Sequence, residues 1–290
     1  MRMRPAGDGP EPRGGASELA APGASRVVEI DDLAFGYREA EQPALDGLTV
    51  SIQRGELACV LGPSGCGKST LLGILSGLLT PQRGRVMVDG TLLYEGGRRL
   101  ARESPPMGYV FQDPRLLPWR RVRQNVELAL RAAGVPQREW DQRVRTYLDM
   151  CGIGQFAGSW PGNLSGGQRQ RVAIARALAI EPTLVLMDEP FSTLDEVTAR
   201  FLRRELLDVW ERTGQTIIFV THSIREAVFL ADHVYVMTAG PGKLLDRRTI
   251  EIARPRAYED PHLTEIEAGM VDWVLRHWGF YDDPPREEGR

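Results

Sequence analysis

The chain has 290 residues, of which 42% are hydrophobic and 26% charged, and its formal net charge is −3 at pH 7. This composition is typical of a globular protein and lacks the basic excess that nucleic-acid-binding proteins usually carry, so we expect no nucleic-acid partner. No apolar run in the sequence approaches the roughly 18 to 20 residues that a membrane helix needs. Any role at a membrane would therefore depend on a partner.

The first 25 residues differ in composition from the rest. Residues 1–25 are rich in Gly, Ala, Pro and Arg without hydrophobic periodicity, which predicts a disordered leader. An organellar presequence is the alternative, disfavoured by the acidic residues of this stretch. The three cysteines, Cys59, Cys66 and Cys151, lack metal-type spacing and indicate a reducing compartment without a disulfide framework.

A phosphate-binding loop follows the first fully apolar strand pattern. Residues 62–70 match G-x-x-x-x-G-K-[ST] between two apolar runs, which predicts a strand, a Gly-rich loop and a helix. The glycines let backbone N–H groups converge on phosphate oxygens, and the helix adds its N-terminal dipole. The predicted nucleotide contacts here are Gly62, Pro63, Ser64, Gly65, Cys66, Gly67, Lys68, Ser69 and Thr70.

Two side chains of this loop have specific chemistry. Lys68 is expected to reach the β- and γ-phosphates, and the Ser69 hydroxyl to hold Mg²⁺. The helix end and Lys68 are also expected to lower the pKa of Cys66. The alternative is an ordinary Gly-rich turn, which the flanking strand and helix patterns disfavour.

Polar residues follow three further strand patterns. The strand 107–111 ends at Gln112, which is either a loop residue or a contact to Mg²⁺ or the attacking water. The buried-type strand 184–187 is followed by Asp188, expected to hold Mg²⁺, and Glu189, expected to orient or deprotonate the water. The strand 216–220 leads to His222. Because each preceding strand of this kind is followed by a candidate site residue, a functional role for His222 is favoured over a structural one.

Residues 113–160 carry helical patterns and are interpreted as a helical subdomain, extending to about residue 165, inserted between strands. The stretch Leu164–Gln168 follows and enters another helix, for which Ser165 is a suitable N-cap. It is either a simple capped helix or a second anion-binding helix end. Tyr37 is either a buried strand tyrosine or a platform for an adenine ring.

These motifs together resemble the ATP-binding subunit of an ATP-binding cassette (ABC) transporter over roughly residues 26–250. The LSGGQ stretch is the most specific member of an ordered set that comprises Tyr37, the loop 62–70, Gln112, Leu164–Gln168, Leu184–Glu189, Asp195 and His222. The resemblance implies an α/β fold: a P-loop NTPase cassette with a mainly parallel core sheet, an antiparallel β subdomain and an inserted helical subdomain.

The resemblance also implies roles for these residues, with ATP and Mg²⁺ as cofactors. The implied catalytic residues are Glu189, His222, Gln112 and Lys68, and the implied metal ligands are Ser69, Gln112 and Asp188. Besides the loop 62–70, the nucleotide contacts would be Tyr37, Ser165, Gly166, Gly167, Gln168 and Asp195. ATP would lie between the phosphate loop of one subunit and the helix end Ser165–Gln168 of the other, in a head-to-tail homodimer. The residues Ser165–Gln168 are called the signature residues.

Within the family, the chain resembles importer subunits for nitrate, sulfonate, taurine and related ions. The residues that carry this likeness are Leu117–Val122, Asn125-Val126, Thr221–Ala227, Pro241-Gly242 and Arg254–Arg256. It implies transmembrane permease subunits and a solute-binding protein as partners, and a peripheral position at the cytoplasmic face of the cell membrane. The helical subdomain would contact the permease.

Two other classes remain open. A non-transport ABC ATPase in cofactor assembly fits the size, whereas a repair ATPase would need a long coiled coil that the interval from Lys68 to Ser165 cannot hold. An ATP-binding scaffold without hydrolysis is disfavoured by Glu189 and His222. Residues 251–290 are predicted to form a helical tail whose apolar side packs on the chain's own body, with a partner surface as the alternative; that side comprises Leu263, Ile266, Met270, Val274 and Trp278.

Overall fold

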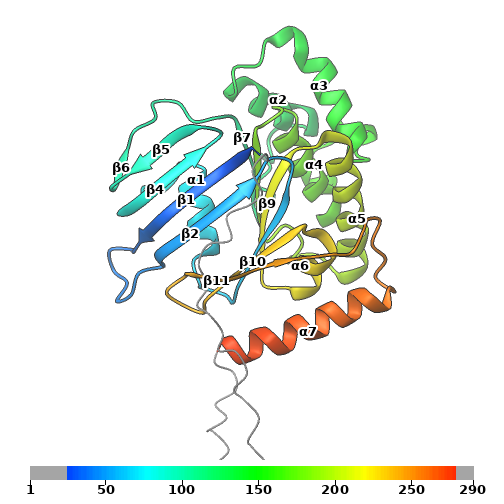
Figure 1. The fold of residues 1–290 in the computed structure, drawn as a ribbon. Helices are drawn as coiled ribbons and strands as arrows, with labels where there is room; N and C mark the ends of the chain where they lie inside the picture. Colours follow the sequence, from blue (N-terminus) through cyan, green and yellow to red (C-terminus); the bar gives the residue numbers. More distant parts are fainter. Residues whose placement is uncertain (1–24, 279–290) are drawn as a thin grey trace, which may run out of the picture.

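The computed structural model describes residues 25–278. The expected leader therefore lies outside the described residues except for Ser25, as does the end of the predicted tail. Two sheets and the helices around them make up the described part of the chain (Figure 1).

The larger sheet forms the centre of the molecule. Across it, the strands are β11 (Leu244–Thr249), β10 (His233–Met237), β3 (Leu57–Leu61), β9 (Thr216–Thr221), β8 (Leu184–Asp188) and β7 (Met107–Val110). All neighbours pair in parallel except β11, which is antiparallel to β10. The central strands are almost continuously apolar because both faces of a parallel sheet are covered.

The smaller sheet is antiparallel and occupies the left of Figure 1. Its order is β2 (Leu45–Gln53), β1 (Arg26–Phe35), β4 (Arg83–Val88), β5 (Thr91–Glu95) and β6 (Arg98–Arg99). The strands β5, β6 and β11 were not foreseen from the sequence. Gly turns at Gly90 and at Gly96-Gly97, all with positive φ, were the signals for the first two.

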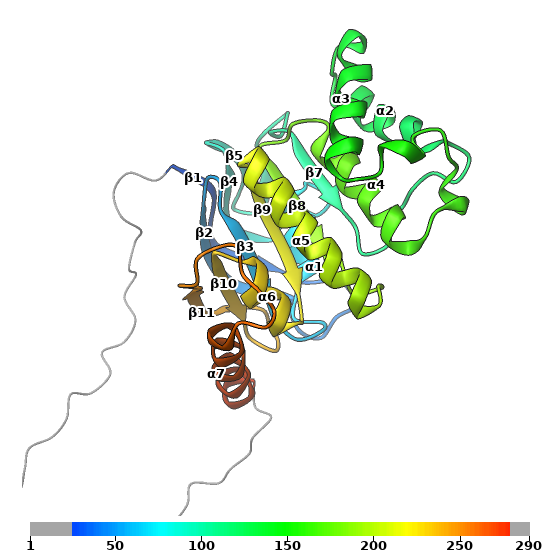
Figure 2. The same cartoon turned by 90° about the vertical axis from the view of Figure 1, so that its right-hand side faces the viewer.

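The helices divide into three groups. Helix α1 (Lys68–Leu75) packs between the two sheets, and α2 (Val122–Ala132), α3 (Gln137–Met150) and α4 (Gly166–Leu178) pack on one another at the upper right of Figure 2. Two short 3-10 helices, Gly154–Phe156 and Pro161–Asn163, lead to α4. The remaining helices are α5 (Glu196–Thr213), α6 (Ile224–Leu230) and α7 (Pro261–His277).

The core sheet separates two hydrophobic cores. Alternate residues of β3 divide between them: Ala58 and Val60 face α1 and the antiparallel sheet, whereas Leu57, Cys59 and Leu61 face the other helices. This arrangement confirms the predicted fold class. The tail helix α7 also forms as expected, with its apolar side on α6 and the core.

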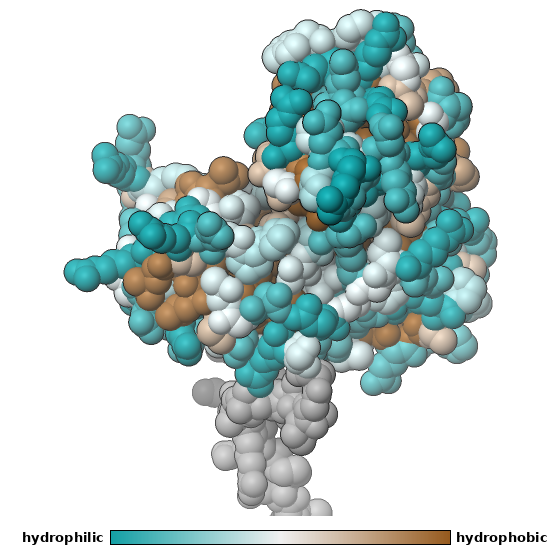
Figure 3. Space-filling view, turned by 90° about the horizontal axis from the view of Figure 1, so that it is seen from above, coloured by the Kyte–Doolittle hydropathy of each residue, from teal (hydrophilic) through white to brown (hydrophobic). Residues whose placement is uncertain are grey.

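Among residues 25–278, no helix is both long enough and apolar enough to cross a membrane. The face shown in Figure 3 is mainly hydrophilic, and its hydrophobic side chains gather in separate patches.

Gly108 provides a test of how closely α4 approaches the core sheet. A Cβ at Gly108 in β7 would lie 2.6 Å from the carbonyl oxygen of Ala177 in α4. We expect Gly108→Ala to lower the free energy of unfolding by about 1–3 kcal/mol, since neither backbone can move easily. In α7, Gly269 has no atom within 4 Å of the corresponding Cβ position, so Gly269→Ala should be neutral or stabilising. Equal urea midpoints for the two variants would contradict this packing.

Candidate nucleotide-binding site

The register of the parallel strands brings the predicted site residues to one edge of the core sheet. Leu61 at the end of β3 pairs with Thr221 at the end of β9, and Asp188 at the end of β8 pairs with Val220. The segments that follow these strands therefore emerge side by side at their carboxyl ends, where α/β sheets bind ligands. They carry the phosphate loop, Glu189 and His222.

The phosphate loop is closed on itself by its lysine. The buried Lys68 Nζ donates to the carbonyl oxygens of Gly62 (2.8 Å) and Pro63 (2.9 Å). Gly67, with φ of 100°, is the N-cap of α1, and a Cβ there would lie 2.5 Å from the carbonyl oxygen of Ala44. Only glycine fits at this point, because both the conformation and the close approach exclude a side chain.

A cavity of about 470 Å³ opens over this loop. The lining includes most of the predicted loop residues and Glu189: Tyr37, Ala40, Gln42, Pro43, Ala44, Ser64, Gly65, Gly67, Lys68, Ser69, Thr70, Glu189, Gly240 and Pro241. The segments 40–44 and 240–241 were missed as site residues, although their prolines and glycine marked them as loops. The second segment can approach the phosphate loop because residue 242 is a glycine. A Cβ at Gly242 would lie 2.2 Å from the Cys66 carbonyl oxygen.

Tyr37 lies at the cavity with 51% of its surface exposed. The interpretation as a buried strand tyrosine is therefore wrong. Its hydroxyl is 3.1 Å from Thr70 Oγ1, and its ring packs edge-on against Phe35 with a centroid distance of 5.0 Å. An exposed ring held at both ends can offer a flat apolar face to a ligand.

The polar side chains at the sheet edge contact one another. Ser69 Oγ donates to Asp188 Oδ1 (2.9 Å), and His222 Nδ1 lies 3.2 Å from Glu189 Oε1, which is itself 4.0 Å from Lys68 Nζ. Glu189 has φ of 42°, a left-handed conformation that costs a residue with a side chain about 1 kcal/mol or more. Such outliers concentrate at functional sites.

Gln112 reaches the same group through a residue that the sequence did not single out. Its Nε2 donates to Ser192 Oγ (3.1 Å), and Ser192 Oγ donates to the carbonyl oxygen of Glu189 (3.0 Å). After Gln112, the chain is fixed to α4 by Arg176, which donates to the carbonyl oxygens of Pro114 and Arg115. Gln112 thus lies between the sheet edge and the helical part of the chain.

Burial shifts the pKa of two groups at this edge. It raises the pKa of Asp188, and the hydrogen bond from Ser69 offsets part of this effect. It also raises the pKa of the Cys66 thiol, because the desolvation of this side chain outweighs the attraction of Lys68. The expectation of a lowered pKa for Cys66 is therefore wrong.

The signature residues lie at a separate pocket. Ser165 caps α4 by accepting a hydrogen bond from Gln168 N (3.3 Å), while Gln168 Oε1 accepts one from Ser165 N (2.9 Å). Ser165, Gly167 and Gln168 line a pocket of about 230 Å³ that shares no residue with the phosphate-loop cavity. Gly166 is the first residue of α4, and Asp195 is the N-cap of α5, next to the same pocket at Thr198.

Asp195 already uses its carboxylate within the chain. It accepts a hydrogen bond from Thr198 N (3.0 Å), and hydrogen bonds from the α5 backbone lower its pKa. The phosphate-loop cavity thus has the Gly-rich N-terminus of α1 beside it, and the second pocket has the capped N-terminus of α4.

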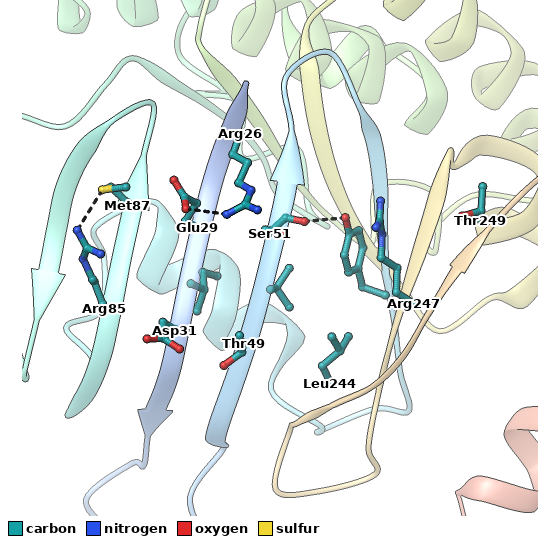
Figure 4. A pocket seen from close by; sticks show the side chains of 13 residues that line it. Arg26, Glu29, Asp31, Thr49, Ser51, Arg85, Met87, Leu244, Arg247 and Thr249 are labelled. Atoms are coloured by element: carbon teal, nitrogen blue, oxygen red, sulfur yellow. Dashed lines mark hydrogen bonds and ion pairs between the residues drawn. The ribbon is translucent and has the colours of Figure 1, made fainter. Parts of the chain in front are cut away.

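A further hollow near the sheets is unrelated to these motifs. It has a volume of about 790 Å³ and lies over the antiparallel sheet and β11, where Arg26 pairs with Glu29 and the Tyr235 hydroxyl donates to the Ser51 carbonyl oxygen (Figure 4). No residue expected at the nucleotide site lines it. The candidate nucleotide site is therefore the cavity over the phosphate loop, which the predicted residues line.

Comparison with known sequences gives a consistent result. The ABC transporter family model matches residues 45–192. A taurine import ATP-binding protein of Pseudomonas aeruginosa is 44% identical over 258 residues, covering 86% of this chain and 95% of that protein. A nitrate import ATP-binding protein of Synechococcus elongatus is 41% identical (83% and 88% covered), and an aliphatic sulfonates import ATP-binding protein of Burkholderia cenocepacia is 42% identical (92% and 94% covered).

Solved structures share the fold. A dimeric ATP-binding cassette in a post-hydrolysis state with ADP and Pi is 31% identical, with a TM-score of 0.67 over 78% of this chain and all of that one. The cbiO1 protein of Clostridium perfringens, part of an ABC transporter complex, is 28% identical with a TM-score of 0.70 over 88% and 96%. The motifs, their meeting at one sheet edge and these likenesses agree: the chain belongs to the ABC transporter family and is an ATP-binding cassette.

Proposed function

We propose that the chain is the ATP-hydrolysing subunit of an importer for a small anionic or zwitterionic solute, of the kind that taurine, nitrate and sulfonates represent. The observation that carries this proposal is the group formed by Lys68, Glu189 and His222 beside the phosphate loop. The solute class comes from the relatives, whose names describe import of these ions.

The cavity over residues 62–70 suits the phosphates of ATP. Backbone N–H groups, the α1 N-terminus and Lys68 all supply positive potential there. On binding, Lys68 would exchange its loop carbonyl contacts for the β- and γ-phosphates. Tyr37, exposed at the same cavity, would pack against the adenine ring.

The residues at the sheet edge fit Mg²⁺. The ion prefers oxygen ligands and commonly uses one or two carboxylates together with phosphate oxygens. Ser69 and Asp188, already in contact, and the Gln112 amide would provide protein oxygens. When bound, Mg²⁺ neutralises charge on the phosphates.

Glu189 would orient the attacking water and accept its proton. Its left-handed backbone and its contact with His222 hold the carboxylate at the edge of the cavity. His222 would fix this carboxylate and contact the terminal phosphate. Gln112, linked through Ser192, would connect occupation of the site to the helical part.

Two pockets on one chain support a head-to-tail homodimer. The signature pocket and the phosphate-loop cavity share no residue, so one chain does not enclose ATP from both sides. In the dimer, residues 165–168 and Asp195 of one subunit would complete the site of the other. ATP binding would then hold the dimer together, and hydrolysis would release it.

Glu189→Gln tests hydrolysis. We expect ATP binding to persist while kcat falls at least about 100-fold, because the base is lost but the phosphate contacts remain. Lys68→Ala should instead weaken ATP binding. The measurements are ATPase rates, nucleotide affinity and size-exclusion profiles with Mg²⁺ and ATP, where Glu189→Gln should accumulate dimer. Near-normal turnover of Glu189→Gln would contradict its role, whereas ATP binding without turnover in the wild type would leave an ATP-binding scaffold as the better description.

Asp188→Asn tests the cost of placing a carboxylate for Mg²⁺. Burial raises the pKa of Asp188 above 3.8, so the folded chain holds the Asp188 proton more tightly than the unfolded chain does. Ionisation of Asp188 therefore lowers the free energy of unfolding as the pH rises from 3.8 through the raised pKa. We expect Asp188→Asn without nucleotide to raise Tm at pH 7, with a gain that shrinks as the pH falls toward 3.8, and to abolish Mg²⁺-dependent ATPase activity. Asp208→Asn, at an exposed position of α5, is the control. A lower Tm for Asp188→Asn at pH 7 would contradict this electrostatic account.

We further infer the domain limits, location and partners of the chain. Residues 26–250 would form the cassette, with the helical subdomain at about 113–165 and a tail at 251–290. The cassette would bind permease subunits at the cytoplasmic face of the cell membrane, together with a solute-binding protein on the other side.

Trp119 is the candidate permease contact. It is 70% exposed, in a loop whose backbone is fixed by the buried Asn125. Asn125 Oδ1 accepts from Leu117 N (2.7 Å), and its Nδ2 donates to the carbonyl oxygens of Arg120 and Arg121 (3.1 Å each). These hydrogen bonds hold the loop backbone without a contribution from the tryptophan side chain.

Trp119→Ala should weaken binding to the permease by about 2 kcal/mol, as expected for loss of an aromatic anchor, and uncouple hydrolysis from transport. Co-purification with the permease is the measurement. ATP binding and Tm should stay nearly unchanged. Leu78→Ala, at a similarly exposed apolar residue (67%) beyond α1, is the matched control. Loss of folding or ATP binding in Trp119→Ala with an intact permease contact would contradict the assignment, and no association with any permease would favour a non-transport ATPase.

A further inference from the structure

A buried ion pair lies directly behind His222. Arg203 of α5 and Glu226 of α6 are both buried, with 2.7 Å between Arg203 Nη2 and Glu226 Oε1. The other oxygen, Glu226 Oε2, accepts a hydrogen bond of 2.6 Å from the hydroxyl of Thr221. Thr221 is the last residue of β9 and immediately precedes His222.

The same residues fix the turn that carries His222. Ser223 N donates to Thr221 Oγ1 (3.0 Å), and Ser223 Oγ accepts from Glu226 N (3.3 Å) as the N-cap of α6. The His222 side chain is half-exposed, and its Nδ1 contacts Glu189 Oε1. Its position is therefore determined mainly by the backbone of this turn.

Residues beyond 250 hold the other side of the ion pair. The Tyr258 hydroxyl accepts from Arg203 Nη1 (3.2 Å), and its ring stacks on Phe229 of α6 with a centroid distance of 3.9 Å. The buried Arg256 guanidinium donates to carbonyl oxygens at the C-terminal end of α6, those of Val228, Phe229 and the C-cap Ala231, and to that of Ile250 just after β11. Both ends of α6 are thus fastened to the segment that leads to α7.

The cost of this arrangement favours a functional explanation. Taking two charges out of water is expensive, and apolar residues of similar volume often stabilise a fold as well or better. The buried Glu226 carboxylate contacts Arg203 with one oxygen and Thr221 with the other, which fixes its orientation. Here that geometry is transmitted to Thr221, one residue before His222.

We propose that Thr221 and Glu226 are positioning residues for ATP hydrolysis, which hold His222 against Glu189 and connect this pair to the C-terminal segment through Arg203 and Tyr258. The proposal rests on the proposed function of His222. None of the four residues is assigned a contact with the nucleotide.

Thr221→Val removes the hydroxyl and keeps the shape of the side chain. We expect kcat for ATP hydrolysis to fall about tenfold, because small misplacements of a catalytic group are costly. The KM for ATP should change less than about twofold, since the phosphate loop is untouched. Thr221→Ser, which retains the hydroxyl, should restore most of kcat.

The same strand supplies the matched control. Thr216 at the start of β9 is buried to the same extent as Thr221, each 2% exposed, and its hydroxyl accepts a hydrogen bond from Gly55 N (2.9 Å). Thr216→Val should therefore lose stability without losing kcat. Wild-type kcat in Thr221→Val, or an equal loss in Thr221→Ser or Thr216→Val, would overturn the proposal.

A double-mutant cycle separates positioning from other effects. In a His222→Ala background, Thr221→Val and Tyr258→Phe should cause no further loss of kcat, whereas each lowers it in the wild type. The same loss in both backgrounds would overturn the proposal, and unchanged kcat in Tyr258→Phe alone would remove the link to the C-terminal segment. A wild-type rate in His222→Ala would instead refute the catalytic role of His222, whatever Thr221 does.

Discussion

The in-register pairing of β3, β9 and β8 is the constraint on which the site depends. These strands end at the same level, so the chain segments after them start within a side-chain length of one another. A shift of one residue in any pairing would turn its side chains to the opposite face. The apolar side chains of both cores therefore fix the register, and the register places Lys68, Glu189 and His222 together.

The polar groups at this edge are held by features that are unfavourable on their own. Glu189 keeps an uncommon left-handed backbone, Asp188 is desolvated, and a buried ion pair supports the turn at His222. Each feature costs stability by itself. Their concentration at the ends of the adjacent strands β8 and β9 is the physical sign of a site built for chemistry, and the two hydrophobic cores supply the stabilisation that offsets it.

The two pockets share no lining residue, which supports the proposal that two chains together form each site. Ser165 and Gln168 satisfy each other in a capping box, so this helix end is capped by the chain's own groups. In the last turn of α4, Arg176 fixes the segment after Gln112 to this helix. A movement at Gln112 would therefore be transmitted to the helical part and to Trp119, at the opposite end of that loop from the nucleotide.

The sequence by itself determined the motifs and their strands, because a phosphate loop needs contiguous glycines and a lysine, and a buried parallel strand needs a continuous apolar run. It also determined the tail helix through its apolar side. Only the tertiary structure decided what depends on contacts between distant residues: the exposure of Tyr37, the raised pKa of Cys66, the link from Gln112 to Ser192, and the pairing of Arg203 with Glu226 and Tyr258. Desolvation and such pairings depend on which side chains pack together, and no local pattern encodes that.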